Sequence, residues 1–148
     1  MAIASLALAL ALVACGGGDA DEKNDYVDQV NEVTTTLNDG LSRISADAPL
    51  ATDPAEASKV FGQFASSLET AASDIGAIDP PEGVAGLHDK LVEDVTTLSD
   101  EATNAANEAK AGGPASLPGV ATQFIDEANR LSGDVDATIA EINTELQS

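Results

Sequence analysis

The chain has 148 residues, of which 26 are acidic and 6 are basic, so its formal net charge at pH 7 is −20. A surface this negative repels nucleic acids, which excludes nucleic-acid binding, and it also repels anionic lipid head groups. The single cysteine excludes an intramolecular disulfide, and the single histidine leaves a metal site without a second imidazole ligand. A chain of this length is typical of one domain with one core.

The chain opens with an uncharged apolar segment, Ile3–Val13. It is too short to span a bilayer as a helix and is typical of the apolar part of a secretory signal peptide. The alternative is a buried first helix with a cysteine in the core. Signal peptides normally carry Lys or Arg before the apolar segment, and this chain has neither there. We therefore expect either a true start upstream of Met1 or an inefficient precursor.

The four residues Leu12-Val13-Ala14-Cys15, followed by a run of glycines, resemble the lipobox of bacterial lipoprotein precursors. The resemblance implies cleavage after Ala14, so that residues 1–14 are a signal peptide, and a diacylglyceryl group on the sulfur of Cys15. Two acyl chains give stable anchoring, where one gives only marginal binding. The expected location is outside the cytoplasm, on the cell membrane, with membrane lipid as the partner of Cys15. Residues 15–25, rich in Gly and Asp, are predicted to be a flexible tether.

Four amphipathic helix patterns follow, at about residues 24–47, 54–76, 82–110 and 117–146. In each pattern apolar residues recur at gaps of three or four, with acidic residues between them. No segment alternates strictly enough to compete as a strand. The main apolar positions are Tyr26, Val30, Val33, Leu37 and Leu41; Val60, Phe64, Leu68, Ala71 and Ile75; Leu87, Leu91, Val95, Leu98 and Ala102; and Val120, Phe124, Leu131, Val135, Ile139 and Ile142.

Helix boundaries are marked by capping residues, prolines and glycines. Asp53-Pro54-Ala55-Glu56 offers an N-cap, a proline at the first helical position and an acid at the third. Gly76 and Asp79-Pro80-Pro81-Glu82 close one helix and open the next, and Ser116 can cap the last. Because the connections are short, neighbouring helices should be antiparallel. The sequence therefore predicts an all-α, up-down-up-down four-helix bundle over residues 26–148.

Residues that could carry chemistry are few. His88 has Asp89 beside it, but consecutive residues on a helix do not face each other. We expect His88 at the edge of the core with its ring toward solvent. Residues 19–25 begin like a calcium-binding EF-hand loop but lack the sixth-position glycine and twelfth-position glutamate. No nucleophile motif or phosphate-binding loop is present, so we expect no enzyme activity, no metal and no cofactor.

The stretch Asp79–His88 contains a proline pair before a helix that carries Leu-His. In this feature the chain resembles small helical lipoproteins found in many actinobacteria. The resemblance implies no activity, and it makes Pro80, Pro81, Leu87 and His88 the positions to examine for binding. The alternative is that the prolines only set the turn and the first residue of the helix.

These features predict a lipid-anchored, non-catalytic module of the cell envelope that binds a protein partner or acts as a spacer. The alternative is a lipoprotein that binds a small solute or cation in a pocket of the bundle. A cavity of several hundred Å³ with a few converging polar groups would favour this alternative.

Overall fold

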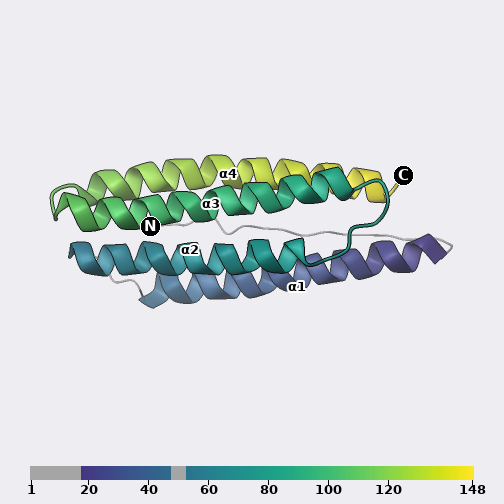
Figure 1. Ribbon diagram of the computed structural model, residues 1–148, viewed down its shortest axis with the longest axis horizontal. Coiled ribbons are helices and arrows are strands. Elements are labelled where there is room, and N and C mark those ends of the chain that lie inside the picture. Colours follow the sequence, from purple (N-terminus) through teal and green to yellow (C-terminus); the bar gives the residue numbers. More distant parts are fainter. Residues whose placement is uncertain (1–17, 48–52) are drawn as a thin grey trace.

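The computed structural model describes residues 18–47 and 53–148, which form four helices with no strand among them (Figure 1). The helices are α1 (Gly18–Asp47), α2 (Pro54–Gly76), α3 (Ala85–Gly112) and α4 (Leu117–Leu146). The fold is therefore all-α, a four-helix bundle. The predicted signal peptide, with Leu12, Val13, Ala14 and Cys15, lies outside the described residues. None of the four helices is long and apolar enough to cross a bilayer.

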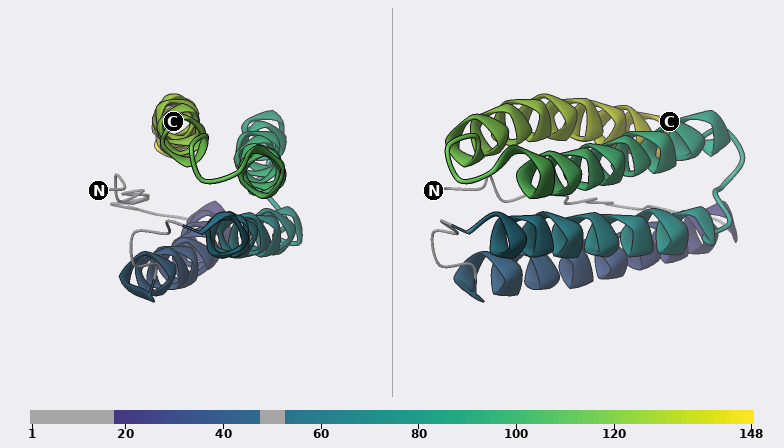
Figure 2. Two further views of the ribbon diagram at one scale, coloured as in Figure 1. Left: turned by 90° about the vertical axis from the view of Figure 1, so that its left-hand side faces the viewer. Right: turned by 60° about the vertical axis from the view of Figure 1, so that its left-hand side comes forward.

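The helices form two layers, α1 beside α2 and α3 beside α4 (Figures 1 and 2). The most extensive packing is between α2 and α3, which join the layers. By contrast, α1 and α4 do not pack extensively against each other. Figure 2 shows them on one side of the bundle, with α2 and α3 on the other. The ring of four helices is thus closed on three sides by helix–helix packing.

Both ends of α2 lie where the sequence predicts them. The side chain of Asp53 accepts hydrogen bonds from the backbone N–H groups of Ala55 and Glu56, at 2.8 and 3.2 Å. Pro54 follows as the first helical residue, where a missing N–H costs nothing. This prediction of the N-cap is confirmed. Ser116 stands at the N-cap position of α4 but makes no side-chain cap, because its hydroxyl donates to the carbonyl of Gly113 instead.

The boundaries of α3 differ from the predicted residues 82–110 because of two glycines. Gly83 has φ +100° and Gly113 has φ +74°, a region of backbone conformation that favours glycine and does not belong to a right-handed helix. The helix therefore begins after Gly83, at Ala85, and ends at Gly112, before Gly113. Glu82 lies in the turn that precedes the helix rather than in its first turn.

The predicted tether over residues 15–25 is wrong for most of its length, because α1 begins at Gly18. Acidic residues such as Asp21 and Glu22 lie in the first turns of this helix, where negative charge is favoured by the partial positive charge of a helix N-terminus. Tyr26 and Val27 bury this part of α1 against the rest of the bundle. Residues whose composition is typical of a linker thus form the first two turns of a packed helix.

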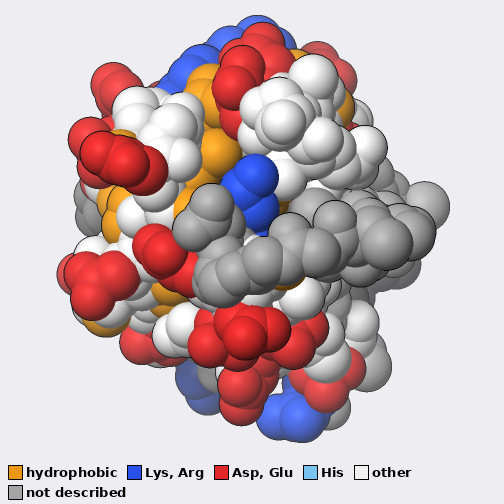
Figure 3. Space-filling model, turned by 90° about the vertical axis from the view of Figure 1, so that its right-hand side faces the viewer, with side chains coloured by type: hydrophobic (Ala, Val, Ile, Leu, Met, Phe, Trp, Pro, Cys, Tyr) orange, Lys and Arg blue, Asp and Glu red, His pale blue; other side chains and the backbone are white. Residues whose placement is uncertain are grey.

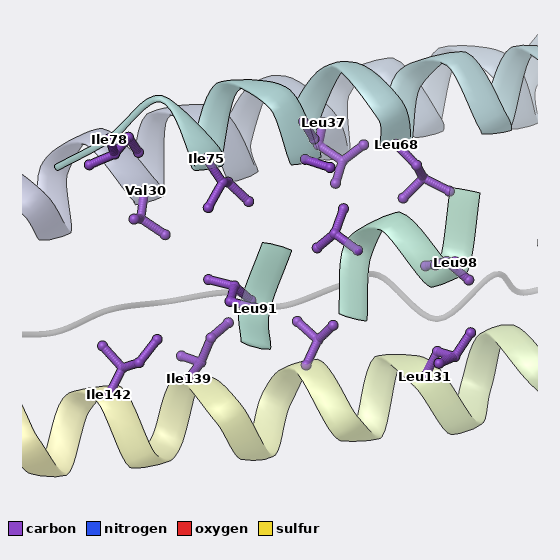
Figure 4. Close-up of a cluster of buried hydrophobic side chains, with 14 of the residues drawn as sticks. Val30, Leu37, Leu68, Ile75, Ile78, Leu91, Leu98, Leu131, Ile139 and Ile142 are labelled. Carbon is purple, nitrogen blue, oxygen red and sulfur yellow. The ribbon is translucent and has the colours of Figure 1, made fainter. Parts of the chain in front are cut away.

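The core is built from the apolar stripes that the sequence predicts. Figure 4 shows side chains from all four helices pointing toward one another between the two layers, among them Leu37, Leu68, Leu98 and Leu131. A second, smaller cluster contains Ala57, Ala105, Ala109, Leu117 and Val120. The rings of Phe61 and Phe124 pack edge to face beside it, with centroids 5.2 Å apart. In this second cluster α2 and α3 contribute alanines, and α4 contributes the larger side chains of Leu117 and Val120.

Candidate functional site at the base of the bundle

We call one end of the bundle the base. It contains the first turns of α1, residues 77–84 and the last turns of α4. The positions singled out in the sequence, Pro80, Pro81 and His88, all lie at or near it. Figure 3 shows this end, where Asp and Glu side chains occupy much of the rim and a basic side chain lies nearer the middle. The base is therefore acidic at its edge.

His88 and Tyr26 form the central feature of the base. The hydroxyl oxygen of Tyr26 lies 3.2 Å from Nδ1 of His88, and the two rings meet edge to face with centroids 5.7 Å apart. Tyr26 is 1% exposed and His88 is 4% exposed. The expectation that the imidazole of His88 faces solvent is therefore wrong. Tyr26 fills the space above the imidazole and supplies a hydrogen-bonding partner that sequence neighbours of His88 do not provide.

Burial shifts the pKa values of both groups toward their neutral forms. Desolvation raises the pKa of the Tyr26 hydroxyl to about 12, from an ordinary value of 10.0. Desolvation also lowers the pKa of His88 below its ordinary 6.5, and the negative charge of Asp89 opposes this shift only in part. At neutral pH the pair is therefore an uncharged phenol against an uncharged imidazole. Both groups are withdrawn from solvent, so the pair joins α1 to α3 inside the bundle.

Two further polar contacts define the base. The ammonium Nζ of Lys23 donates to the backbone carbonyl of Leu146 at 2.9 Å, which satisfies an otherwise unpaired carbonyl in the last turn of α4. A positive charge is also favoured at that position by the helix dipole. Nearby in sequence, Oδ1 of Asn143 is buried and has no hydrogen-bond partner among the described residues. Such an atom is uncommon in a folded protein and costs free energy unless it finds a partner.

Pro80 is half-buried and Pro81 is buried in the connection between α2 and α3. The carbonyl of Pro81 accepts the backbone N–H of Val84 at 3.2 Å, across the turn that contains Gly83. Leu87 is half-buried and packs on the edge of the main core. The structure thus brings His88 into contact with Tyr26, whereas the two prolines lie in the turn between α2 and α3.

Two hollows open to solvent lie on the outer surface between α3 and α4. One, of about 700 Å³ near the base, is lined by Gly83, Gly86, Leu87, Ala140, Glu141, Thr144 and Glu145. The other, of about 850 Å³ near the opposite end, is lined by Glu101, Pro118, Gly119, Thr122, Gln123, Asp126 and Glu127. Both lie outside the helix bundle rather than within it. In the part of the chain that the structure describes, no three His, Cys, Asp or Glu side chains are grouped to hold a metal ion.

A polar link between these hollows holds α3 and α4 together. Lys90 Nζ donates to Asp94 Oδ2 at 2.6 Å and to Thr138 Oγ1 at 2.8 Å, and so bridges the two helices. Thr138 is buried and also lies 3.0 Å from Asp94 Oδ2. Hydrogen bonding to Asp94 raises the pKa of Lys90, so its ammonium stays charged over the physiological range. The residues of this link satisfy one another, which fits a structural role.

Sequence reasoning missed Tyr26 and Asn143 as members of the base. Tyr26 lies on the apolar stripe of its helix, and this position predicts burial but no polar partner. Its partner His88 is 62 residues away in the chain, and no pattern in one sequence pairs residues at that distance. Asn143 flanks the apolar position Ile142, and only its burial in the fold marks it.

Comparison of the chain with models of protein families, with curated proteins and with solved structures finds no match.

Proposed function

We propose that the chain is a lipoprotein of the cell envelope, anchored outside the cytoplasm by a diacylglyceryl group on Cys15. Its body would be an antiparallel, up-down-up-down four-helix bundle that serves as a non-catalytic binding or spacer module. The observation that carries the proposal is the sequence Leu12-Val13-Ala14-Cys15 directly after an uncharged apolar segment. The resemblance to small helical lipoproteins of actinobacteria supports the same assignment.

The start of α1 bears on how such an anchor would hold the body. Only Gly16 and Gly17 separate Cys15 from the first residue of α1. Three residues of chain reach at most about 10 Å. The distance between the acidic body and the lipid head groups would therefore be much smaller than a flexible tether of residues 15–25 would allow. The base of the bundle is the end nearest the anchor.

The polar groups of the base support a binding or spacer role over catalysis. Tyr26 and His88 are buried and pair with each other, so neither presents a reactive atom to a substrate. A catalytic acid or base needs its reacting atom within reach of the substrate proton. The exposed faces of the helices carry most of the acidic residues, and these faces are the surface that a partner would contact.

Replacement of Cys15 tests the anchor directly. We expect the variant Cys15→Ala to leave the membrane fraction of the producing cells and to accumulate with residues 1–14 still attached, because both lipidation and cleavage require the thiol. Metabolic labelling with palmitate and intact-mass measurement report the two steps separately. The matched control is Ser5→Ala in the same apolar segment, which should fractionate and label like the parent chain. Membrane association of Cys15→Ala equal to that of the parent would contradict the proposal.

The alternative, a lipoprotein that binds a small solute or cation, has its support in the two open hollows with carboxylates at their edges. A thermal-unfolding screen against cations and small metabolites distinguishes the two functions. A ligand present at 100 times its Kd stabilises the folded protein by about 2.7 kcal/mol. A shift of this size that is lost in Glu101→Gln or Glu141→Gln would favour the alternative, and no shift with any compound would favour a protein partner or a spacer.

A further inference from the structure

The first turns of α1 extend past the end of α2 at the base of the bundle (Figure 1). Helix α1 has 30 residues and α2 has 23, so α1 is longer by about two turns. Among the described helices, α1 packs extensively on α2 alone. The start of α1 is therefore held at the base by individual contacts to α3 and α4 rather than by a continuous helix–helix interface.

Two polar contacts hold this part of α1. Lys23 Nζ donates to the backbone carbonyl of Leu146 on α4 at 2.9 Å, and the hydroxyl oxygen of Tyr26 lies 3.2 Å from Nδ1 of His88 on α3. Among side chains, imidazole is the one whose ordinary pKa lies between pH 5 and 8. The contact between Tyr26 and His88 is therefore the one that mild acid can change.

Protonation of His88 places a positive charge in a site that is 4% exposed. The hydrogen bond does not prevent this, because the phenol oxygen of Tyr26 can accept from an imidazolium N–H as well as donate to a neutral imidazole. The cost comes from removing the charge from water. Burial accordingly lowers the pKa of His88. Below pH 6.5 the imidazolium is thus more stable in an open base, where water reaches it.

No neighbouring carboxylate removes this cost. Asp89 is the one charged group among the described residues that acts on the pKa of His88, and it raises that pKa by less than burial lowers it. From α1, the group that faces the imidazole is the uncharged phenol of Tyr26. The acidic residues that the surrounding elements bring to the base are exposed and screened by water: Glu22 of α1, Asp74 of α2, Asp79 and Glu82 of the turn, and Glu141 and Glu145 of α4.

We propose that His88 and Tyr26 form a pH-sensitive switch, in which protonation of His88 in mild acid releases the first turns of α1 from α3 and α4 while the rest of the bundle stays packed. At neutral pH the uncharged pair closes the base. In acid, opening uncovers Tyr26 and Val27, which are 1% and 4% exposed in the closed base. The open base would present a small apolar surface that is hidden at neutral pH.

The switch goes beyond the function proposed above and does not depend on lipidation of Cys15, because all its parts lie on α1, α3 and α4. Its size follows from linkage. Each pH unit below 6.5 favours the open base by up to about tenfold, until the lowered pKa of His88 in the closed base is reached. Between pH 7.5 and 5.0 the open population therefore rises by at most about 30-fold.

Cysteine labelling of the full-length chain tests the switch. In a Cys15→Ala background, Val27→Cys places a thiol beside Tyr26. Its rate of reaction with a pyridyl disulfide is measured at pH 7.5 and 5.0 and divided by the rate for the urea-unfolded chain at the same pH. We expect this normalised rate to rise about threefold to 30-fold in acid. It should depend only weakly on low urea concentrations, because a local opening exposes little surface.

The control for opening of the whole bundle is Ser99→Cys in the same background. Ser99 is buried between α2 and α3, where its hydroxyl donates to the carbonyl of Ala65. In acid this site should react more slowly than position 27 and with a steep dependence on urea. Identical rates and urea dependence at the two positions would mean that the base opens only when the whole bundle unfolds, and would overturn the proposal.

Two further variants separate His88 from the other contact of α1. His88→Gln should abolish the rise at position 27 between the two pH values, whatever its effect on the rate at pH 7.5. Lys23→Met removes the bond to Leu146, so it should speed labelling at position 27 at both pH values and leave the rise intact. Equal normalised rates at pH 7.5 and 5.0 in the parent chain, or an equal rise in His88→Gln, would also overturn the proposal.

Discussion

Tyr26 on α1 and His88 on α3 are hydrogen-bonded at 3.2 Å across the diagonal of the bundle, although 62 residues separate them in the chain. The helices that carry them are not neighbours in either layer, since α2 lies between them in sequence and packs on both. The pair therefore fixes the position of α1 relative to the rest of the bundle at the base. Because the chain has one tyrosine and one histidine, the ionisation of each side chain can be followed separately and reports on this contact.

The first prediction concerns the ionisation of Tyr26. Burial raises its pKa to about 12, and the chain has one tyrosine and no tryptophan, so the ultraviolet absorbance of tyrosinate reports this residue alone. We expect a midpoint near 12 in the folded protein and near 10 in denaturant. Since the folded-state pKa is the higher one, the associated stability is complete below pH 10 and is lost as the pH rises toward 12. A folded-state midpoint near 10 would show that the phenol is solvated.

The second prediction concerns stability in mild acid. Burial lowers the pKa of His88 below 6.5, so the unfolded chain binds more protons than the folded chain between the two pKa values. The contribution of His88 to the free energy of unfolding is therefore complete above pH 6.5 and is lost as the pH falls through the lowered pKa. Urea titrations of the parent and of His88→Gln across this range measure it. Relief of repulsion among the many carboxylates acts in the opposite sense and is common to both chains. Parallel stability curves for the two chains would refute the prediction.

The third prediction concerns the N-cap of α2. Asp53→Ala removes the acceptor for the N–H groups of Ala55 and Glu56 and should lower the free energy of unfolding by about 0.5–2 kcal/mol. Glu69→Ala, an exposed acidic position in the same helix, is the matched control for loss of one negative charge. Denaturant unfolding of both variants gives the difference, and equal stabilities would mean that the cap contributes nothing beyond its charge.

The fourth prediction concerns the core. Leu91 is fully buried in the middle of the main cluster, and Leu91→Ala should cost about 2–5 kcal/mol through lost burial and a cavity. Leu87, one turn earlier and half-buried, carries the same side chain in a place where neighbouring groups and water can fill the space. Leu87→Ala should therefore cost clearly less. A larger loss at position 87 than at 91 would place the centre of the core elsewhere.

The buried faces of the helices could be predicted from the sequence because the spacing of apolar residues along a helix determines which face is buried. Val30, Leu91, Val95 and Ile142 were all on predicted stripes, and all are buried. The beginning of α2 was predictable as well, since capping by Asp53 and the proline that follows it act within four residues. These features depend on residues that are close together in the chain, so a single sequence is enough to predict them.

Features that depend on contacts between distant residues were not predictable. The segment before Tyr26 has the composition of a linker, and it is helical because Tyr26 and Val27 pack on the bundle and Lys23 bonds to the carbonyl of Leu146. The burial of His88 likewise depends on Tyr26. For α3, a proline pair suggested a helix start at residue 82, but the positive φ of Gly83 is a property of the folded turn.

The early start of α1 has a consequence for an anchored protein. If Cys15 carries the proposed lipid, at most about 10 Å of chain would separate it from the helix, and the bundle would be held close to the membrane surface. A helix of 30 residues would carry the far end, with the connection between α3 and α4, about 45 Å from the base. Its height above the lipid would then vary little, so a partner would have to meet it at a nearly constant distance.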